Sequence, residues 1–320
     1  MEKIVYVLTS DYSDNYLEQL SLSLYSLRLH NPSLYVEIVV DRETNLSLRG
    51  DRLSLIEGAS LITAIDVPAG YDKMRKSRWL KTNLRNLIAG DFLFVDTDTI
   101  ICDNIDFSKI SSGEISAVKD LHVNVNNHAH KYDILDRAKI VNWDLSDENK
   151  PYYNSGVLYV RDSDKTRQFY KVWNETWKVS EANGCASDQP SLCKTNELFG
   201  GIITPLDDNW NCQITENGIR FLSEAIIIHY FASGKSKALS PYIFNNENIY
   251  CKIKNEGLTE SIKQLLENPK QAFIPKVQLI SDKDAELFNS PLSKYLRKFF
   301  YSCPRFYKKM ISLGRKIKHI

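Results

Sequence analysis

Apolar and polar residues alternate in two patterns along the first hundred positions. Short runs rich in β-branched and aromatic residues predict strands at residues 3–10, 34–40 and 59–68, with a fourth from residue 92. Residues 15–32 carry leucines at helical spacing up to Asn31-Pro32, and residues 73–90 form a second predicted helix that ends at Gly90. Because strands alternate with helices, we expect a parallel α/β sheet with helices on both faces.

The second half of the chain has a less regular pattern. Apolar runs predict strands at residues 152–161 and 224–231, and the segment between them predicts a helix at residues 164–179. A further helix is expected from Ser187, whose hydroxyl is a typical N-terminal cap. Beyond residue 257 the signal weakens to one short predicted helix, residues 258–268.

Composition fits one large globular domain, with or without an appendage: 43% of the 320 residues are hydrophobic and 25% are charged. The apolar run after Met1 is too short for a signal peptide, and no later run is long enough to span a bilayer. The six cysteines form no C-x-x-C pair, which disfavours zinc ribbons and disulfide frameworks. We therefore expect a cytoplasmic protein.

Charge is unevenly distributed along the chain. Residues 291–320 hold six Lys and three Arg without any Asp or Glu, although the whole chain has a net charge of only +1. One helical face of this tail would carry Phe306, Met310, Leu313, Ile317 and Ile320. A basic amphipathic helix binds anionic membrane surfaces, so we predict peripheral association with the inner face of the membrane. Docking of the tail on its own domain is the alternative, and the acidic remainder disfavours nucleic acid.

Two aspartates follow the strand that begins at residue 92. Asp96 and Asp98 lie at the carboxyl end of this strand, where open parallel sheets bind ligands. Side chains two positions apart in an extended chain point to the same side, so both carboxylates can bind one divalent metal ion. The alternative is a polar turn after the strand. No glycine-rich dinucleotide or P-loop motif occurs in the chain.

The order of several motifs resembles the retaining glycosyltransferases of family 8. The motifs are KIVYVLTSDYSDNY, RWLKTNL, DFLFVDTDTII, YYNSGVLYV, SDQPSL, LDDNWN and IIIHYFASGK, spread over about residues 3–240. The resemblance implies a GT-A fold, in which a Rossmann-like nucleotide-binding sheet is followed by an acceptor-binding half. It also implies transfer of a sugar from a UDP-sugar with retention of configuration at the anomeric carbon.

A metal site is the first implication of the resemblance. The family's Asp-x-Asp motif, matched by Asp96, Thr97 and Asp98, binds Mn²⁺ or Mg²⁺ at the donor diphosphate, and His229 matches the third protein ligand. From the sequence alone, a histidine that ends an apolar strand is more often a satisfied core residue. Lys235 matches a lysine that contacts the diphosphate. The residues around it depart from the family pattern, so Lys237 is a substitute candidate.

The donor nucleotide and sugar account for the next set of residues that the resemblance implies. Thr9, Asp11 and Tyr16 match the uridine-binding loop, although Tyr16 equally fits a helix residue packed on the sheet. Lys81 matches a basic residue that reaches the donor, and Arg78, one turn earlier, competes with it. Either could also be an ordinary helix charge.

Residues from the second half of the chain complete the predicted site. Asn154 and Ser155 belong to an element whose asparagine contacts the sugar, and Asp188 and Gln189 match a pair near the anomeric carbon. We favour same-face attack with Asp188 positioning the sugar, because the amide of Gln189 is a poor nucleophile. Acceptor-side candidates are Asp207, Asp208 and Trp210. A turn with a core tryptophan is their structural alternative.

These inferences predict a metal-dependent retaining hexosyltransferase acting on a glycan or lipid-linked acceptor in bacterial surface polysaccharide or lipopolysaccharide synthesis. Glucose and galactose are the expected sugars. The catalytic domain is placed at residues 1–250, with the nucleotide-sugar half up to about residue 120, a helical extension at 251–290 and the basic tail at 291–320. The alternatives are an inverting GT-A transferase, a sugar nucleotidyltransferase, or a non-catalytic module that binds nucleotide-sugar or membrane.

Overall fold

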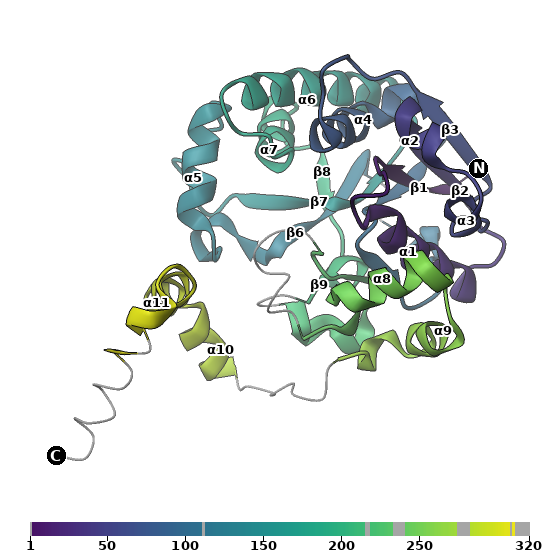
Figure 1. The fold of residues 1–320 in the computed structure, drawn as a ribbon. Helices are drawn as coiled ribbons and strands as arrows, with labels where there is room; N and C mark the ends of the chain where they lie inside the picture. Colours follow the sequence, from purple (N-terminus) through teal and green to yellow (C-terminus); the bar gives the residue numbers. More distant parts are fainter. Residues whose placement is uncertain are drawn as a thin grey trace. The chain divides into compact units, whose positions relative to one another are not determined.

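A seven-stranded sheet lies at the centre of the computed structural model (Figure 1). The structure describes residues 2–110, 113–214, 218–232, 241–273, 282–307 and 309–310. The sheet has the order β3-β2-β1-β4-β7-β6-β8. In chain order its strands are β1 (Lys3–Leu8), β2 (Tyr35–Asp41), β3 (Leu61–Ile65), β4 (Phe92–Val95), β6 (Ile115–Asn124), β7 (Pro151–Val160) and β8 (Ile203–Pro205).

The sheet is mixed rather than parallel. Strands β3, β2, β1 and β4 run parallel, as the sequence predicts. Strand β7 runs antiparallel to both β4 and β6, so the prediction of a parallel sheet is wrong for this half. The reason is that β7 is buried along nearly its whole length, like the parallel strands β1 and β2, and a continuous apolar run carries no information about direction.

Helices cover both faces of the sheet (Figure 1), as predicted. On one face, Val5 and Val7 of β1 belong to a core with α4 (Lys73–Leu87), α6 (Asp164–Ala182) and α7 (Gln189–Leu198). On the other face, Ile4, Tyr6 and Leu8 pack with α1 (Tyr16–His30). This alternation along β1 is the two-residue period of a strand.

A second, three-stranded sheet continues from the end of β4. It has the order β5-β10-β9, formed by β5 (Thr99–Ile101), β10 (Ile227–His229) and β9 (Cys212–Gln213). The chain passes from β4 to β5 through Asp96–Asp98, and β10 pairs antiparallel with β5 so that His229 lies opposite Thr99. The small sheet therefore brings a histidine from late in the chain beside the two aspartates.

The helix predicted from Ser187 begins two residues later. Helix α7 starts at Gln189, with Asp188 in the capping position and Pro190 in the first turn. The Asp188 carboxylate makes no capping hydrogen bond, and the expected Ser187 cap is wrong. Proline at the start of a helix loses no hydrogen bond, which explains why the helix begins here.

The remaining helices fall into two units. The first unit, Met1–Val277, contains α2 (Arg42–Ser47), α3 (Asp51–Ser54), α5 (Lys131–Ile140), α8 (Glu247–Glu256) and α9 (Glu260–Glu267). Helices α8 and α9 pack against α1; α8 crosses the predicted boundary at residue 250, and α9 lies within the predicted extension at 251–290. The second unit, Gln278–Ile320, contains α10 (Asp282–Asn289) and α11 (Pro291–Ser302). Among the described residues, no helix has the length and apolar character that crossing a membrane requires.

Candidate active site

A cleft of about 310 Å³ opens at the carboxyl ends of β1 and β4. It brings together twelve of the residues predicted from the sequence: Thr9, Tyr16, Arg78, Lys81, Asp96, Thr97, Asp98, Asn154, Ser155, Asp188, Gln189 and His229. They come from six separate segments of the chain. The position agrees with the rule that open α/β sheets bind ligands beyond the carboxyl ends of their strands.

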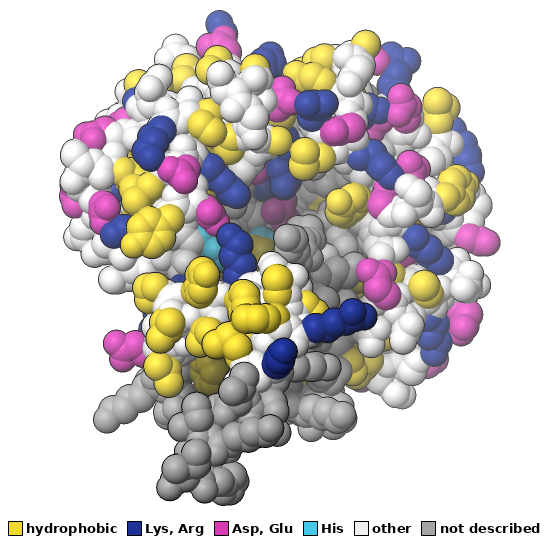
Figure 2. Space-filling view, turned by 60° about the vertical axis from the view of Figure 1, so that its left-hand side comes forward, with side chains coloured by type: hydrophobic (Ala, Val, Ile, Leu, Met, Phe, Trp, Pro, Cys, Tyr) yellow, Lys and Arg dark blue, Asp and Glu magenta, His cyan; other side chains and the backbone are white. Residues whose placement is uncertain are grey.

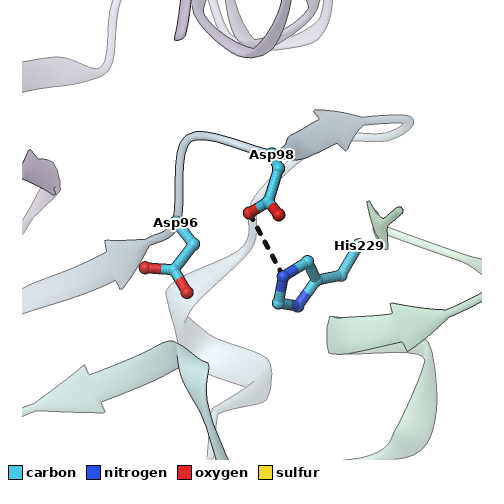
Figure 3. Close-up of side chains that lie close together, drawn as sticks. All are labelled: Asp96, Asp98 and His229. Atoms are coloured by element: carbon cyan, nitrogen blue, oxygen red, sulfur yellow. Dashed lines mark ion pairs between the residues drawn. The ribbon is translucent and has the colours of Figure 1, made fainter. Parts of the chain in front are cut away.

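Asp96, Asp98 and His229 form a potential metal site in this cleft (Figure 3). One ligand atom from each lies within 4.8 Å of the other two. Asp96 follows β4, Asp98 precedes β5, and the imidazole of His229 reaches them from β10 (Figure 3). The Nε2 atom of His229 is 3.3 Å from Oδ1 of Asp98.

Backbone contacts hold this turn in place. The amide of Asp96 donates to the carbonyl of Gly156 at 2.7 Å, and the amide of Ala232 donates to Oδ2 of Asp98 at 2.9 Å. Gly156 is required for the close approach, because a Cβ atom there would lie 2.4 Å from Cε1 of His229. The glycine of the predicted Asn-Ser-Gly element therefore makes room for the histidine.

Charge coupling between the imidazole and the carboxylates controls their protonation. Burial acts to lower the pKa of His229, but the Asp98 carboxylate outweighs it and raises that pKa. Burial acts to raise the pKa of Asp98, and the facing imidazole with the Ala232 amide lowers it instead. Asp98 and His229 therefore favour a positive charge between them, which either a proton or a metal ion can supply.

The donor set fits a divalent cation. Two carboxylates and one imidazole suit Mn²⁺, and the carboxylates also suit Mg²⁺. All three residues line the cleft. The arrangement leaves positions for ligand oxygens of a bound molecule.

A buried cationic cluster lies beside these ligands. Nζ of Lys81 is 3.2 Å from Oδ1 of Asp96 and 3.3 Å from Oδ2 of Asp188. Nε of Arg78 lies 3.0 Å from Oδ1 of Asp188, and the Ser155 hydroxyl donates to Oδ2 at 2.7 Å. Burial acts to raise the pKa of Asp188, but Lys81 and Arg78 dominate and hold it well below its usual range. Asp188 is a carboxylate with both oxygens occupied.

The loop after β1 forms the outer wall. The Thr9 hydroxyl donates to the carbonyl of Lys73 at 3.0 Å, and Tyr16 is 39% exposed at the cleft surface. Asp11 does not line the cleft; its carboxylate binds Lys73 at 2.9 Å. Lys73 also binds Asp14 at 2.8 Å and lines the cleft itself. Asp11 therefore acts on the cleft through a lysine.

The acceptor-side candidates lie outside the cleft lining. Trp210 is only 2% exposed and packs in the core below the α1 face of the sheet. Asp208 accepts a hydrogen bond from Nδ1 of His122 at 2.8 Å. Asp207 precedes the short 3₁₀ helix Asp208–Asn211. Lys235 and Lys237 lie outside the described residues.

Sequence reasoning did not single out four residues that shape the site. Lys73 and Phe231 line the cleft, and Phe231 has a left-handed φ of +48° with its ring 4.2 Å from that of His229. Asp120 and Asn211 hydrogen-bond to Asn154, behind the lining. Asn211 belongs to the LDDNWN motif, so the signal that identifies it is its place beside the aspartates and the tryptophan of that motif.

The chain is similar to known proteins in sequence and in fold. The sequence profile described as glycosyl transferase family 8 matches residues 7–238. No curated protein matches the chain. Among solved structures, galactosyltransferase LgtC with donor and acceptor sugar analogues shares 18% identity, covering 88% of this chain and 98% of that chain with a TM-score of 0.53. Mouse xyloside xylosyltransferase 1 shares 15% identity, covering 72% and 98%, with a TM-score of 0.48. At this identity, the likeness to LgtC shows the fold alone.

Proposed function

The chain belongs to glycosyl transferase family 8, and we propose that it transfers a hexose, glucose or galactose, from a UDP-sugar with retention of anomeric configuration in a divalent-metal-dependent reaction. The acceptor is a glycan or a lipid-linked glycan of a bacterial surface polysaccharide or lipopolysaccharide. The observation that carries the proposal is the Asp96, Asp98 and His229 cluster at the mouth of a cleft lined by Arg78 and Lys81.

A diphosphate fits the electrostatics of this cleft. Three protein ligands face one point, and two buried or half-buried cations lie beside them. When bound, Mn²⁺ or Mg²⁺ neutralises the charge that develops on the departing UDP. Arg78 and Lys81 add fixed positive charge in a site of low dielectric, where it stabilises a transition state more than it would in water.

Asp188 positions the donor sugar in this proposal. A carboxylate nucleophile needs a free oxygen facing the anomeric carbon, whereas Arg78 occupies one oxygen of Asp188, and Ser155 and Lys81 occupy the other. Gln189 offers only an amide, which is weakly nucleophilic. Its Nε2 donates to the carbonyl of Tyr153 at 3.4 Å. These contacts favour attack by the acceptor hydroxyl on the same face that UDP leaves.

The second unit supports a membrane-surface role. Leu292, Tyr295 and Leu296 of α11 are 69%, 68% and 39% exposed and share one helical face. Lys294 and Lys298, four residues apart, fall on the opposite face. Hydrophobic side chains gather on one surface in Figure 2, with Lys and Arg beside them. We propose that α11 associates peripherally with the cytoplasmic side of an anionic membrane; of the stripe expected further on, only Phe306 and Met310 lie in described residues.

The test is metal-dependent release of UDP. Purified protein is incubated with UDP-glucose or UDP-galactose, with Mn²⁺, with Mg²⁺ or with chelator, and released UDP is measured with and without candidate acceptors. Wild-type protein should release UDP only with metal, and Asp98→Ala should abolish it. Asp106→Ala is the matched control, because the contacts of Asp106 with Ser108 and Lys109 lie within its own loop, away from the cleft lining.

The thermal midpoint separates the outcomes. A ligand that binds only the folded state raises the midpoint, so UDP with Mn²⁺ should stabilise wild-type protein but not Asp98→Ala. Stabilisation without any UDP release from either donor, with every acceptor tried, would point to a non-catalytic nucleotide-sugar module. A product of inverted configuration would contradict the retaining mechanism.

A further inference from the structure

A chain of buried amides lies behind the metal ligands. Asn211 is fully buried and Asn154 is 2% exposed. Oδ1 of Asn211 is 3.2 Å from Nδ1 of His229, and its Nδ2 donates to Oδ1 of Asn154 at 2.9 Å. Nδ2 of Asn154 in turn donates to Oδ1 of Asp120 at 2.7 Å. The chain thus joins the metal-site histidine to a carboxylate on β6.

The direction of every hydrogen bond in this chain is determined. The backbone amide of Gly156 donates to Oδ1 of Asn154 at 2.8 Å, and a backbone amide can only donate. Oδ1 of Asn154 is therefore an acceptor, so Asn211 presents its NH₂ group to Asn154. Its carbonyl oxygen consequently faces His229, and Nδ1 of His229 must carry a hydrogen.

This hydrogen determines the tautomer of the imidazole. With Nδ1 protonated, the neutral ring has its lone pair on Nε2, which is the nitrogen that faces Asp98 at 3.3 Å. Nδ1 is a donor in the charged ring as well, so the hydrogen bond to Asn211 persists in both protonation states. A neutral imidazole with a free Nε2 is the form that binds a metal ion.

Packing against the His229 imidazole does not select its tautomer, whereas the hydrogen bond from Nδ1 to Asn211 does. The Phe231 ring covers one side of His229, and Gly156 lies against its Cε1 edge. Neither contact distinguishes one ring nitrogen from the other. Within the part of the chain that the structure describes, Asn211 is the hydrogen-bond partner of Nδ1.

We propose that Asn211 is a positioning residue of the metal site, which orients His229 and fixes the tautomer that presents Nε2 to the ion. This inference rests on the proposed metal-dependent function and deepens it. The hydrogen bond to Asn154 holds the amide of Asn211 in the required orientation. Asn154, which lines the cleft, therefore also influences the orientation of His229 through Asn211. Asn211 itself does not line the cleft.

The test is the affinity of the full-length protein for Mn²⁺ in the presence of UDP, measured from the electron paramagnetic resonance signal of free Mn²⁺. Asn211→Leu removes the acceptor for Nδ1 and should weaken Mn²⁺ binding roughly 10- to 100-fold, the range for residues that orient metal-bound histidines. Asn211→Asp keeps an acceptor for Nδ1 but loses the donor to Oδ1 of Asn154, so its Mn²⁺ affinity should fall less than that of Asn211→Leu.

Asn31→Leu is the matched control. Asn31 is also a buried asparagine with two hydrogen bonds, to the carbonyl of Asp103 and from the amide of Ile105, but it lies at the far end of α1. It should lose stability without a change in Mn²⁺ affinity. Thermal midpoints without metal show whether each variant is folded.

A double-mutant cycle decides whether Asn211 acts through His229. In a His229→Ala background, Asn211→Leu should not change Mn²⁺ affinity further, because the coupled residue is absent. Equal Mn²⁺ affinity of folded Asn211→Leu and wild type would overturn the inference and leave the proposed function intact. Absence of Mn²⁺ binding in wild type itself, with UDP present, would instead overturn the proposed metal dependence.

Discussion

The ammonium of Lys81 lies 3.2 Å from both carboxylate oxygens of Asp96. Lys81 is 3% exposed, so its ammonium is paired with Asp96 and, 3.3 Å away, with Asp188 rather than with water. The ring of Phe94, 4.9 Å below the ammonium, adds a cation–π contact. One lysine on α4 thus joins a proposed metal ligand to the carboxylate beside the proposed sugar site.

Lys81→Met should destabilise the protein by about 3 kcal/mol, because it leaves two carboxylates without their buried cation. It should also strengthen the dependence of stability on Mn²⁺, since a divalent ion beside Asp96 restores positive charge. The measurement is the urea midpoint with and without Mn²⁺. Lys150→Met, which breaks a more exposed pair with Glu197, is the control and should show no added metal response. An equal metal response in both variants would refute the coupling.

Gly156→Ala should abolish stabilisation by Mn²⁺ with UDP, because the new methyl group would lie 2.4 Å from His229 and 2.9 Å from Asp96. One of these ligands must then move. Gly70→Ala is the control: Gly70 has a φ of +83°, so alanine is strained there, but no atom lies within 4 Å of its Cβ position. Gly70→Ala should lower the thermal midpoint and keep the ligand response, which Gly156→Ala should lose.

Much of the fold follows from local pattern. Burial in β1, α1 and β4 is periodic or continuous within one segment, and the pattern of apolar residues in the sequence predicts such burial directly. The direction of β7 does not follow from local pattern, because it depends on how β7 pairs with strands that are distant in the sequence. Strand β6 escaped prediction because its register shifts between Ala117 and Lys119, which breaks the alternation of the pattern.

The candidate site shows the same division. Asp96 and Asp98 stand out because they are close in sequence and follow an apolar run. His229 needed the family resemblance, since its proximity to Asp98 arises from the pairing of β10 with β5. Asn211 and Asp120 act from behind Asn154. Asn211 belongs to a recognised motif, whereas Asp120, on the unpredicted strand β6, has no distinctive sequence spacing. Contacts made by tertiary pairing are therefore the part that the sequence does not reveal.

Asp188→Asn should make the free energy of unfolding depend less steeply on pH in the acid range. The folded-state pKa of Asp188 lies well below that of the unfolded chain, so its stabilisation is fully present above the unfolded value and is lost as pH falls toward the folded one. Urea unfolding from pH 7 down to the acid transition measures this. The difference between wild type and variant should shrink as pH falls below about 4. A difference that stays constant with pH would contradict the assigned ion pairing with Arg78 and Lys81.

Tyr16→Ala should weaken UDP binding, because the Tyr16 ring lines the cleft, where it can stack on a uracil base. Loss of aromatic stacking on a base costs roughly 1–3 kcal/mol, which corresponds to about a 5- to 150-fold higher Kd. Tyr12→Ala is the control in the same loop, since Tyr12 lies under Arg52 and does not line the cleft. Calorimetric titration with UDP and Mn²⁺ compares them. Equal effects would place the base elsewhere.

Reversal of two charges on α11 should weaken binding to anionic vesicles. Each basic residue near such a surface contributes about 1 kcal/mol, so Lys294→Glu with Lys298→Glu should raise the apparent Kd by roughly tenfold or more. Lys109→Glu with Lys139→Glu changes the net charge equally, at side chains that are 72% and 76% exposed on the first unit. Sedimentation with phosphatidylserine-containing and purely zwitterionic vesicles measures both. If the two double variants lose binding equally, net charge rather than α11 holds the protein at the membrane, whereas selective loss in the α11 variant assigns the surface to this helix.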